Sequence, residues 1–237
     1  MARLPLLQEL PISQRVPTMN EYDSKAQSYF GTPRREMLEF VPPGVNSVLE
    51  IGCGTGAFGA LVKQQRGTSR YVGVELMSQA AEVARTLLDE VIVTNIEQNP
   101  LPFPPESFDC LVCNDVLEHL VDPWTILKTL VRFVRPGGYI VISLPNVRFS
   151  EVVKNLVIRK QWEYEEQGVL DRTHLRFFTE SSIRALFNSS GLEILQLRGI
   201  NPIKYAWRLR LLNILLLGAL SDMRFMQYGC LGKLPVK

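Results

Sequence analysis

The chain has 237 residues, of which 46% are hydrophobic and 21% charged, values typical of a single large globular domain with its own core. A net charge of +2 argues against nucleic acid as the main partner. The charge is uneven, however. Residues 1–145 hold 12 Lys/Arg and 16 Asp/Glu, a balance of −4, whereas residues 146–237 hold 14 and 8, a balance of +6. The basic surplus lies in the part of the chain that we expect to meet the substrate.

The first twenty residues contain three prolines and no continuous apolar core, which predicts an extended leader and not a secretory signal. We expect residues 1–30 to form a leader and cap, and residues 31–237 to form one domain. The cap would supply aromatic side chains to the acceptor: Tyr22, Tyr29 and Phe30. The four cysteines have no disulfide-framework spacing, and Cys110 and Cys113 fall in one strand-like run, so we interpret them as buried thiols. This favours a reducing, cytoplasmic location.

The central motif joins an apolar run to three alternating glycines. Ser47–Ile51 reads as a buried strand, Gly52, Gly54 and Gly56 follow, and a helix begins at Ala57. Glycine allows positive φ and close approach of a ligand to the backbone. The motif therefore predicts a nucleotide-like ligand across the turn.

Two ligand classes use such a turn. The spacing Gly54-x-Gly56-x-x-Gly59 formally fits a dinucleotide. S-adenosylmethionine (SAM) has no phosphate, and two features favour it. Glu50 lies where a carboxylate could reach the ammonium of a methionine moiety, and the glycines begin earlier than a dinucleotide turn needs, at Gly52.

Helices and strands alternate along the rest of the chain. The expected strands after the first are 70–75, 91–93, 108–113, 139–144, 192–200 and 225–234, and the expected helices include 78–88, 122–134 and one from Thr179 or Ser181 to Ser190. Such alternation predicts a parallel sheet whose ligands bind beyond the carboxyl ends of the strands. The side chains at those ends are Glu50, Glu75, Asn95, Asn114 and Asp115. Glu75 follows the glycine turn by about twenty residues, the usual spacing of a ribose-hydroxyl acceptor.

Further motifs carry a resemblance to a known family. They are Leu101-Pro102-Phe103-Pro104, the run Asp115–Leu120, Leu144–Val147, and Gly168–Thr179. With these, the chain from about Tyr29 to its end resembles a class I SAM-dependent methyltransferase. The last motif resembles a subgroup found among bacterial glycan and natural-product O-methyltransferases. The resemblance implies an α/β, Rossmann-like fold: a seven-stranded, mostly parallel sheet with one antiparallel C-terminal strand and helices on both faces.

The resemblance also implies roles for individual residues. Gly52, Cys53, Gly54 and Gly56 would line the methionine side of SAM, with Glu50 nearby. Glu75 would hold the ribose, and Leu76 would cover the adenine. Asn95 and Ile96 would flank the adenine; the family often has Asp at the position of Asn95, and an amide oxygen can still accept from the adenine amino group. Asn114 and Asp115 would lie beside the methionine portion. Arg34 would pair with the methionine carboxylate, or be a solvated helix charge.

Methyl transfer to a hydroxyl needs an in-line geometry, exclusion of water and a proton acceptor. The neutral-pH candidates are His119 and His174. We interpret His174 as the catalytic base or a substrate hydrogen bonder, with a structural network of His174, Asp171, Arg172 and Arg176 as the alternative. His119 is expected to pack against the cofactor loop. No spacing of carboxylates and histidines suggests a metal site, so catalysis is expected to be metal-independent.

Two insertions are expected on the acceptor side. Residues 147–179 would contribute Phe149, Trp162, Tyr164 and His174. Residues 201–224 are rich in leucine but too short and too Arg-flanked to span a bilayer. The segment 203–224 is interpreted as a buried cap helix, a dimer face or an interfacial membrane helix, which would make the protein membrane-peripheral.

The favoured function is transfer of a methyl group from SAM to a hydroxyl, or less readily an amine, of a sugar or other small-molecule acceptor, with S-adenosylhomocysteine as product. Small-molecule or glycan acceptors are therefore the expected partners, and nucleic acid is not. Three alternatives stay open: a quinone- or lipid-type O-methyltransferase, a SAM-binding protein without turnover, and a dinucleotide oxidoreductase.

Overall fold

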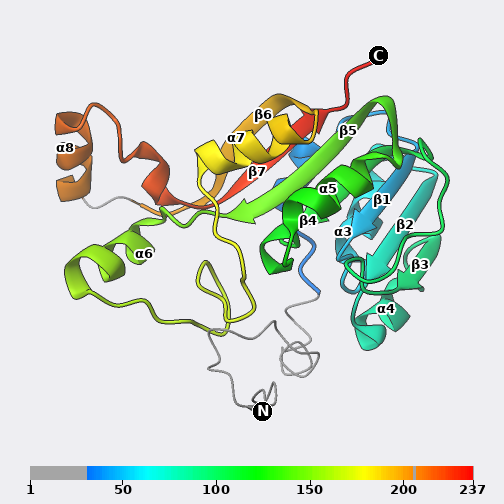
Figure 1. Cartoon of the computed structure of the whole chain (residues 1–237), viewed down its shortest axis with the longest axis horizontal. Helices are drawn as coiled ribbons and strands as arrows, with labels where there is room; N and C mark the ends of the chain where they lie inside the picture. Colours follow the sequence, from blue (N-terminus) through cyan, green and yellow to red (C-terminus); the bar gives the residue numbers. More distant parts are fainter. Residues whose placement is uncertain (1–30, 205–206, 237) are drawn as a thin grey trace, which may run out of the picture.

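A computed structural model describes residues 31–204 and 207–236 (Figure 1). The leader and its three aromatic residues, Tyr22, Tyr29 and Phe30, lie outside the described residues. The domain is built on one seven-stranded sheet with the order β3-β2-β1-β4-β5-β7-β6. Its strands are β1 (Ser47–Ile51), β2 (Arg70–Glu75), β3 (Glu90–Val93), β4 (Phe108–Asn114), β5 (Val134–Pro145), β6 (Glu193–Pro202) and β7 (Phe225–Lys233).

The first five strands pair in parallel, and β7 inserts antiparallel between β5 and β6. The expected Rossmann-like sheet with an antiparallel last strand is therefore confirmed. Because β1 to β5 all end at the same edge, their carboxyl ends place the polar residues of the glycine turn and of the neighbouring strands side by side.

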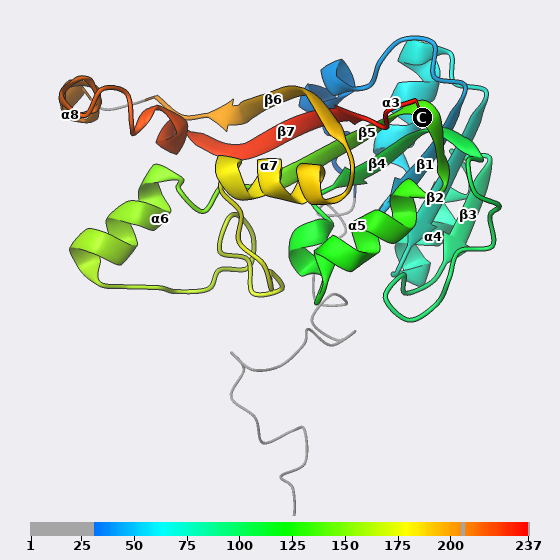
Figure 2. The same cartoon turned by 45° about the horizontal axis from the view of Figure 1, so that its top comes forward.

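Helices cover both faces of the sheet (Figures 1 and 2). The helical elements are η3 (Arg35–Phe40), α3 (Ala57–Arg66), α4 (Ser78–Ala84), η4 (Leu117–His119), α5 (Pro123–Val131), α6 (Ser150–Lys154), the π-helix η5 (Asn155–Arg159), α7 (Glu180–Ser189), α8 (Trp207–Leu215) and η6 (Ser221–Arg224). One buried core joins the sheet to η3, α3 and α4, and a second joins it to α5 and α7. Cys110 belongs to the first core and Cys113 to the second, and all four cysteines are buried and free, as expected.

The start of β5 differs from the expectation. The helix was expected to reach Val134 and the strand to begin at Tyr139, whereas α5 ends at Val131 and β5 already begins at Val134. The pairing of β5 with β4 shifts register between Phe108 and Cys110, so the Pro-Gly-Gly segment bulges within the strand. A Cβ on Gly138 would lie 2.8 Å from the carbonyl oxygen of Asp109, which explains why glycine occupies this bulge.

The two insertions project beyond the end of the sheet where β5 ends, and both views show α6 and α8 there (Figures 1 and 2). Arg148 joins them, because it pairs with Asp222 at 2.6 Å and donates to the carbonyl of Ala219 at 2.8 Å. The leucine-rich segment is exposed, with Leu215 at 71% and Leu217 at 97%.

The interpretation of this segment as a buried cap helix is therefore wrong. Most of the described apolar side chains of α8 and of the turn after it are exposed, namely Trp207, Leu211, Leu212, Ile214, Leu215, Leu216 and Leu217. No helix in the described ranges is both long enough and apolar enough to cross a membrane.

Candidate functional site

The glycine turn has the backbone that its sequence demands. Gly52, Gly54 and Gly56 have φ values of 69°, 53° and 80°, a region that other residues adopt at a cost. Gly52 donates to the carbonyl of Val74 at 2.8 Å, which holds the turn against the end of β2. A Cβ at Gly52 would lie 2.5 Å from Val116 Cγ2, so this position also requires glycine for space.

Glu75, at the end of β2, contacts the glycine turn through its side chain. One carboxylate oxygen accepts from the backbone N–H of Gly54 at 2.8 Å, and the other accepts from Leu76 and Met77, each at 2.9 Å. Burial raises the pKa of Glu75, although these three backbone donors oppose the shift. The arrangement fixes a carboxylate whose remaining lone pairs can accept from hydroxyl groups.

Glu50 is almost completely buried at 2% exposure and accepts from the hydroxyl of Tyr71 at 3.0 Å. Burial raises its pKa to about 8; the Tyr71 hydrogen bond lowers it and the charge of Glu75 raises it. Glu50 is thus a carboxyl group that a nearby cation would convert to its charged form.

The polar residues at the ends of β3 and β4 differ in how they are held. The Asn95 side-chain oxygen accepts from the backbone N–H of Glu97 at 2.9 Å, which orients its amide. Asn114 has a buried side-chain amide whose nitrogen and oxygen both lack a hydrogen-bond partner among the described residues. An orphaned amide of this kind is costly unless a ligand satisfies it.

Asp115 anchors a polar network that sequence reasoning did not foresee. It has a φ of 53° and accepts from Ser143 Oγ at 2.8 Å and from Gln227 Nε2 at 3.0 Å. Arg34 forms ion pairs with Asp115 and with Glu36, the latter at 2.7 Å. With its side chain only 14% exposed, Arg34 is not a solvated helix charge.

One cavity of about 1040 Å³ connects these groups. Its described walls include ten of the eleven residues expected to bind the cofactor, namely Glu50, Gly52, Cys53, Gly54, Glu75, Leu76, Asn95, Ile96, Asn114 and Asp115. Gly56, the N-cap residue that precedes α3, is not part of this wall. The insertion contributes Glu166, Gln167 and Gly168 to the wall, not its aromatic residues. Those pack elsewhere: Phe149 is buried, and the ring of Trp162 lies against Phe177 at 5.3 Å.

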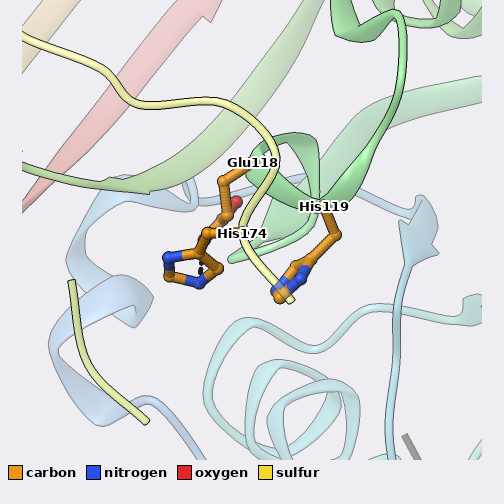
Figure 3. Close-up of side chains that lie close together, drawn as sticks. All are labelled: Glu118, His119 and His174. Atoms are coloured by element: carbon orange, nitrogen blue, oxygen red, sulfur yellow. Dashed lines mark ion pairs between the residues drawn. The ribbon is translucent and has the colours of Figure 1, made fainter. Parts of the chain in front are cut away.

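His119 lines the cavity, whereas His174 lies behind it and is only 6% exposed. Their rings meet edge to face with centroids 4.8 Å apart. Glu118, which precedes His119 in η4, places a carboxylate oxygen 3.9 Å from His174 Nε2 (Figure 3). Burial raises the pKa of Glu118 to about 8, although its own backbone amide and the charge of Arg34 oppose the shift. Glu118 had no role predicted from the sequence, and the cluster was not foreseen from it.

Comparison with known proteins agrees with this geometry. Residues 22–197 match the model of a family described as a methyltransferase domain. The chain belongs to the class I SAM-dependent methyltransferases. Its fold is shared with a SAM-dependent methyltransferase from Thermotoga maritima, with a TM-score of 0.60, 22% identity and coverage of 91% of this chain and 95% of that one.

Two curated relatives of this methyltransferase carry the same name, ubiquinone biosynthesis O-methyltransferase. The protein from Cupriavidus pinatubonensis is 28% identical over 68% of this chain and 67% of its own length. The protein from Vibrio atlanticus is 26% identical over 68% of this chain and 70% of its own length.

The residues of the cavity fit SAM, the cofactor of this family. The turn at Gly52 to Gly56 allows close approach of a ligand to its backbone. Glu75 offers a hydrogen-bond acceptor in a fixed position, and Glu50 offers a carboxyl group that can become negatively charged. Asn114 offers an amide that has no hydrogen-bond partner among the described residues. The donor and acceptor set thus matches a ligand with ribose hydroxyls at one end and an amino acid at the other.

Proposed function

We propose that this methyltransferase methylates a hydroxyl group on an apolar, ring-containing acceptor of the quinone-lipid type. One observation carries the proposal: a single cavity runs from the glycine turn to His119, so it can hold SAM and a second molecule against an acid–base cluster. The names of the two relatives support an O-methyl acceptor of this class. The comparisons give no support to a sugar acceptor.

In the proposed complex, Glu75 accepts from the ribose hydroxyls, and Leu76, Asn95 and Ile96 surround the adenine. Glu50 and Asn114 receive the ammonium and carboxylate end of the methionine moiety. This placement is supported by the order of the residues along the cavity, with β2 and β3 at one side and β1 and β4 at the other.

SAM supplies a methyl group on a sulfonium, which needs little further activation. The acceptor oxygen forms a bond to the methyl carbon, the sulfur–carbon bond breaks, and S-adenosylhomocysteine leaves. The proton of the hydroxyl leaves at the cluster of Glu118, His119 and His174. His119 faces the cavity. We therefore propose that the ring of His119 lies between the reacting atoms and His174, the residue expected to be the base.

The exposed apolar helices support a lipid-type acceptor. Leu156, Val157 and Ile158 on η5 are 49%, 68% and 74% exposed, and Ile214 and Leu217 on or after α8 are 70% and 97% exposed. Basic side chains accompany them: Lys154, Arg159, Lys160 and Arg210. Apolar side chains among basic ones are typical of elements that lie on an anionic membrane surface. We propose that 203–224 and η5 contact the membrane that holds the acceptor, in preference to a second copy of the chain.

Purified protein incubated with methyl-labelled SAM and a panel of acceptors tests the proposed function. The panel contains catechols with an apolar prenyl-type tail, the same catechols without the tail, nucleotide sugars and biogenic amines. We expect label in the tailed catechol, with kcat/KM at least ~10-fold above the tailless one. Label in nucleotide sugars alone would contradict the acceptor class, and SAM binding without turnover on any acceptor would favour a non-catalytic role.

A further inference from the structure

Glu118 is a carboxylate that is completely buried and receives no hydrogen bond from the described residues. Its side chain is 0% exposed, and neither oxygen has a hydrogen-bond partner in the described part of the chain. An isolated buried carboxylate is expensive, and proteins retain one where it is paired or coordinates a metal. The gap of 3.9 Å to His174 Nε2 is too long for a hydrogen bond. Glu118 is therefore placed for a ligand between the two side chains.

Both histidines of the cluster are held in the same tautomer. Nδ1 of His174 lies 3.0 Å from the carbonyl oxygen of Val169, and Nδ1 of His119 lies 3.1 Å from that of Thr173. A carbonyl oxygen only accepts, so each Nδ1–H donates, and in the neutral ring Nε2 is then the nitrogen that can coordinate a metal. Donation of the far ring nitrogen to a carbonyl is how proteins orient imidazoles that bind a metal.

The three ligand atoms already lie close together. All are within 4.8 Å of one another, and Figure 3 shows Glu118 and His119 on η4 with His174 on the facing loop. The backbone joins that loop to η4, because Leu175 and Arg176 donate to the carbonyl of Glu118 at 2.8 and 3.0 Å. A metal ion with bonds of about 2.1 Å holds its ligands about 3 to 3.5 Å apart, so a small side-chain rotation closes the site.

We propose that Glu118, His119 and His174 bind one divalent transition-metal ion of the Zn²⁺ type. Two imidazole nitrogens and one carboxylate favour such an ion, whereas Mg²⁺ and Ca²⁺ prefer sites made of oxygen. Because His119 lies on the cavity wall, the open coordination positions face the cavity. The expectation of metal-independence came from spacing in the sequence, where the two histidines lie 55 positions apart.

The ion gives the cluster a chemical role that deepens the proposed function and rests on it. A cation at the wall lowers the pKa of a hydroxyl that reaches it, so the acceptor hydroxyl loses its proton at this cluster, and the proton then passes to solvent. The metal site itself does not depend on the identity of the acceptor. Binding of the ion can therefore be measured without any acceptor.

Calorimetric titration of the chelator-treated full chain with Zn²⁺, Mn²⁺ and Mg²⁺ tests the site. We expect one equivalent of Zn²⁺ with a Kd of about 1 μM or below, Mn²⁺ weaker than Zn²⁺, and Mg²⁺ at least ~100-fold weaker. Substoichiometric Zn²⁺ binding (below about 0.2 equivalents), or equal affinity for Mg²⁺ and Zn²⁺, overturns the proposal.

Variants of the proposed ligands test whether the ion binds to these residues. Glu118→Gln and His119→Gln are each expected to weaken Zn²⁺ binding at least ~100-fold, since loss of an outer-shell partner alone costs 10- to 100-fold. Glu151→Gln, an exposed carboxylate on α6, is the matched control and should leave the affinity unchanged. If Glu118→Gln fails to fold by circular dichroism, the half-buried His119 carries the test. Unchanged Zn²⁺ affinity in His119→Gln overturns the site.

Visible absorption of Co²⁺ in the wild type and in His119→Gln gives a second readout of nitrogen ligation. We expect ligand-field bands in the wild type that the variant loses; identical spectra overturn the site. The two proposals fail separately. Zn²⁺ binding without methylation of any acceptor refutes the proposed function alone, whereas full methylation in excess chelator by protein that binds no Zn²⁺ refutes the metal site alone.

Discussion

The carboxylate of Glu75 accepts a hydrogen bond of 2.8 Å from the backbone N–H of Gly54, 21 residues earlier in the chain. This contact ties the glycine turn after β1 to the end of β2. The side chain that is proposed to hold the ribose thus also shapes the turn that receives the rest of the cofactor. Binding of SAM and local stability should respond together when it is changed.

Glu75→Gln tests this double role. The amide nitrogen cannot accept, so at least one backbone N–H loses its partner, at a cost of about 1–3 kcal/mol in unfolding free energy. We expect SAM affinity to fall at least ~30-fold by calorimetry and the urea midpoint to fall with it. Glu82→Gln, an exposed residue of α4, serves as control. Full SAM affinity in Glu75→Gln would contradict the assigned ribose contact.

Gly52→Ala tests whether the turn needs space as well as positive φ. A Cβ there would meet Val116 Cγ2 at 2.5 Å, whereas at Gly44, with a similar φ of 79°, nothing lies within 4 Å. Gly44→Ala should cost about 1–2 kcal/mol of unfolding free energy from backbone strain alone. Gly52→Ala should cost about 1–3 kcal/mol more from overpacking and should abolish SAM binding. Equal effects of the two substitutions in urea unfolding would show that space at Gly52 is unimportant.

The raised pKa of Glu50, about 8, makes SAM binding depend on pH. Below pH 8 the free protein carries mostly the neutral carboxyl, and the ammonium group of SAM favours the charged form, so binding releases a proton. Affinity should therefore rise about 20-fold from pH 6 to 7.5, since the limiting slope is tenfold per pH unit and flattens near the pKa.

Calorimetry in buffers of different ionisation enthalpy counts the protons released at pH 7. We expect a release close to one in the wild type and much less in Glu50→Gln, whose affinity should be low at both pH values. The same release and the same slope in Glu50→Gln would exclude Glu50 as the group that titrates.

The exposed apolar segment after β6 gives a prediction about membranes. The double variant Ile214→Asp, Leu217→Asp should reduce co-sedimentation with anionic phospholipid vesicles at least ~10-fold, because each change removes buried apolar area and adds a repelled charge. Val83→Asp, which alters an exposed apolar residue of α4, should bind vesicles like the wild type. A dimer in light scattering that both substitutions at 214 and 217 dissociate, with vesicle binding unchanged, would favour the dimer face instead.

The sheet was predictable because its strands are apolar runs bounded by Gly, Pro and polar ends. The positions of Glu50 and Glu75 followed from the same pattern, since Glu50 is the penultimate residue of β1 and Glu75 the last residue of β2, the two strands beside the glycine turn. The cluster of Glu118, His119 and His174 could not be found this way. His174 is held beside η4 by contacts that include the backbone hydrogen bonds from Leu175 and Arg176 to Glu118, tertiary contacts that no sequence period encodes.

The leucine-rich segment shows a second limit of structure prediction from the sequence. Apolar composition predicts burial when a surface is available to cover it, and the sequence does not show whether the domain offers one. In the structure, Leu215 and Leu217 are exposed, although the composition favoured a cap helix. The Pro-Gly-Gly bulge in β5 is a similar case, because it depends on the register with β4.

A crystal structure of the chain with S-adenosylhomocysteine tests the central claim most directly. We expect density in the cavity with the ribose hydroxyls within hydrogen-bond distance of Glu75 and the amino-acid end beside Glu50 and Asn114. Ordered ligand at a different place on the molecule, with the glycine turn left uncovered, would contradict it.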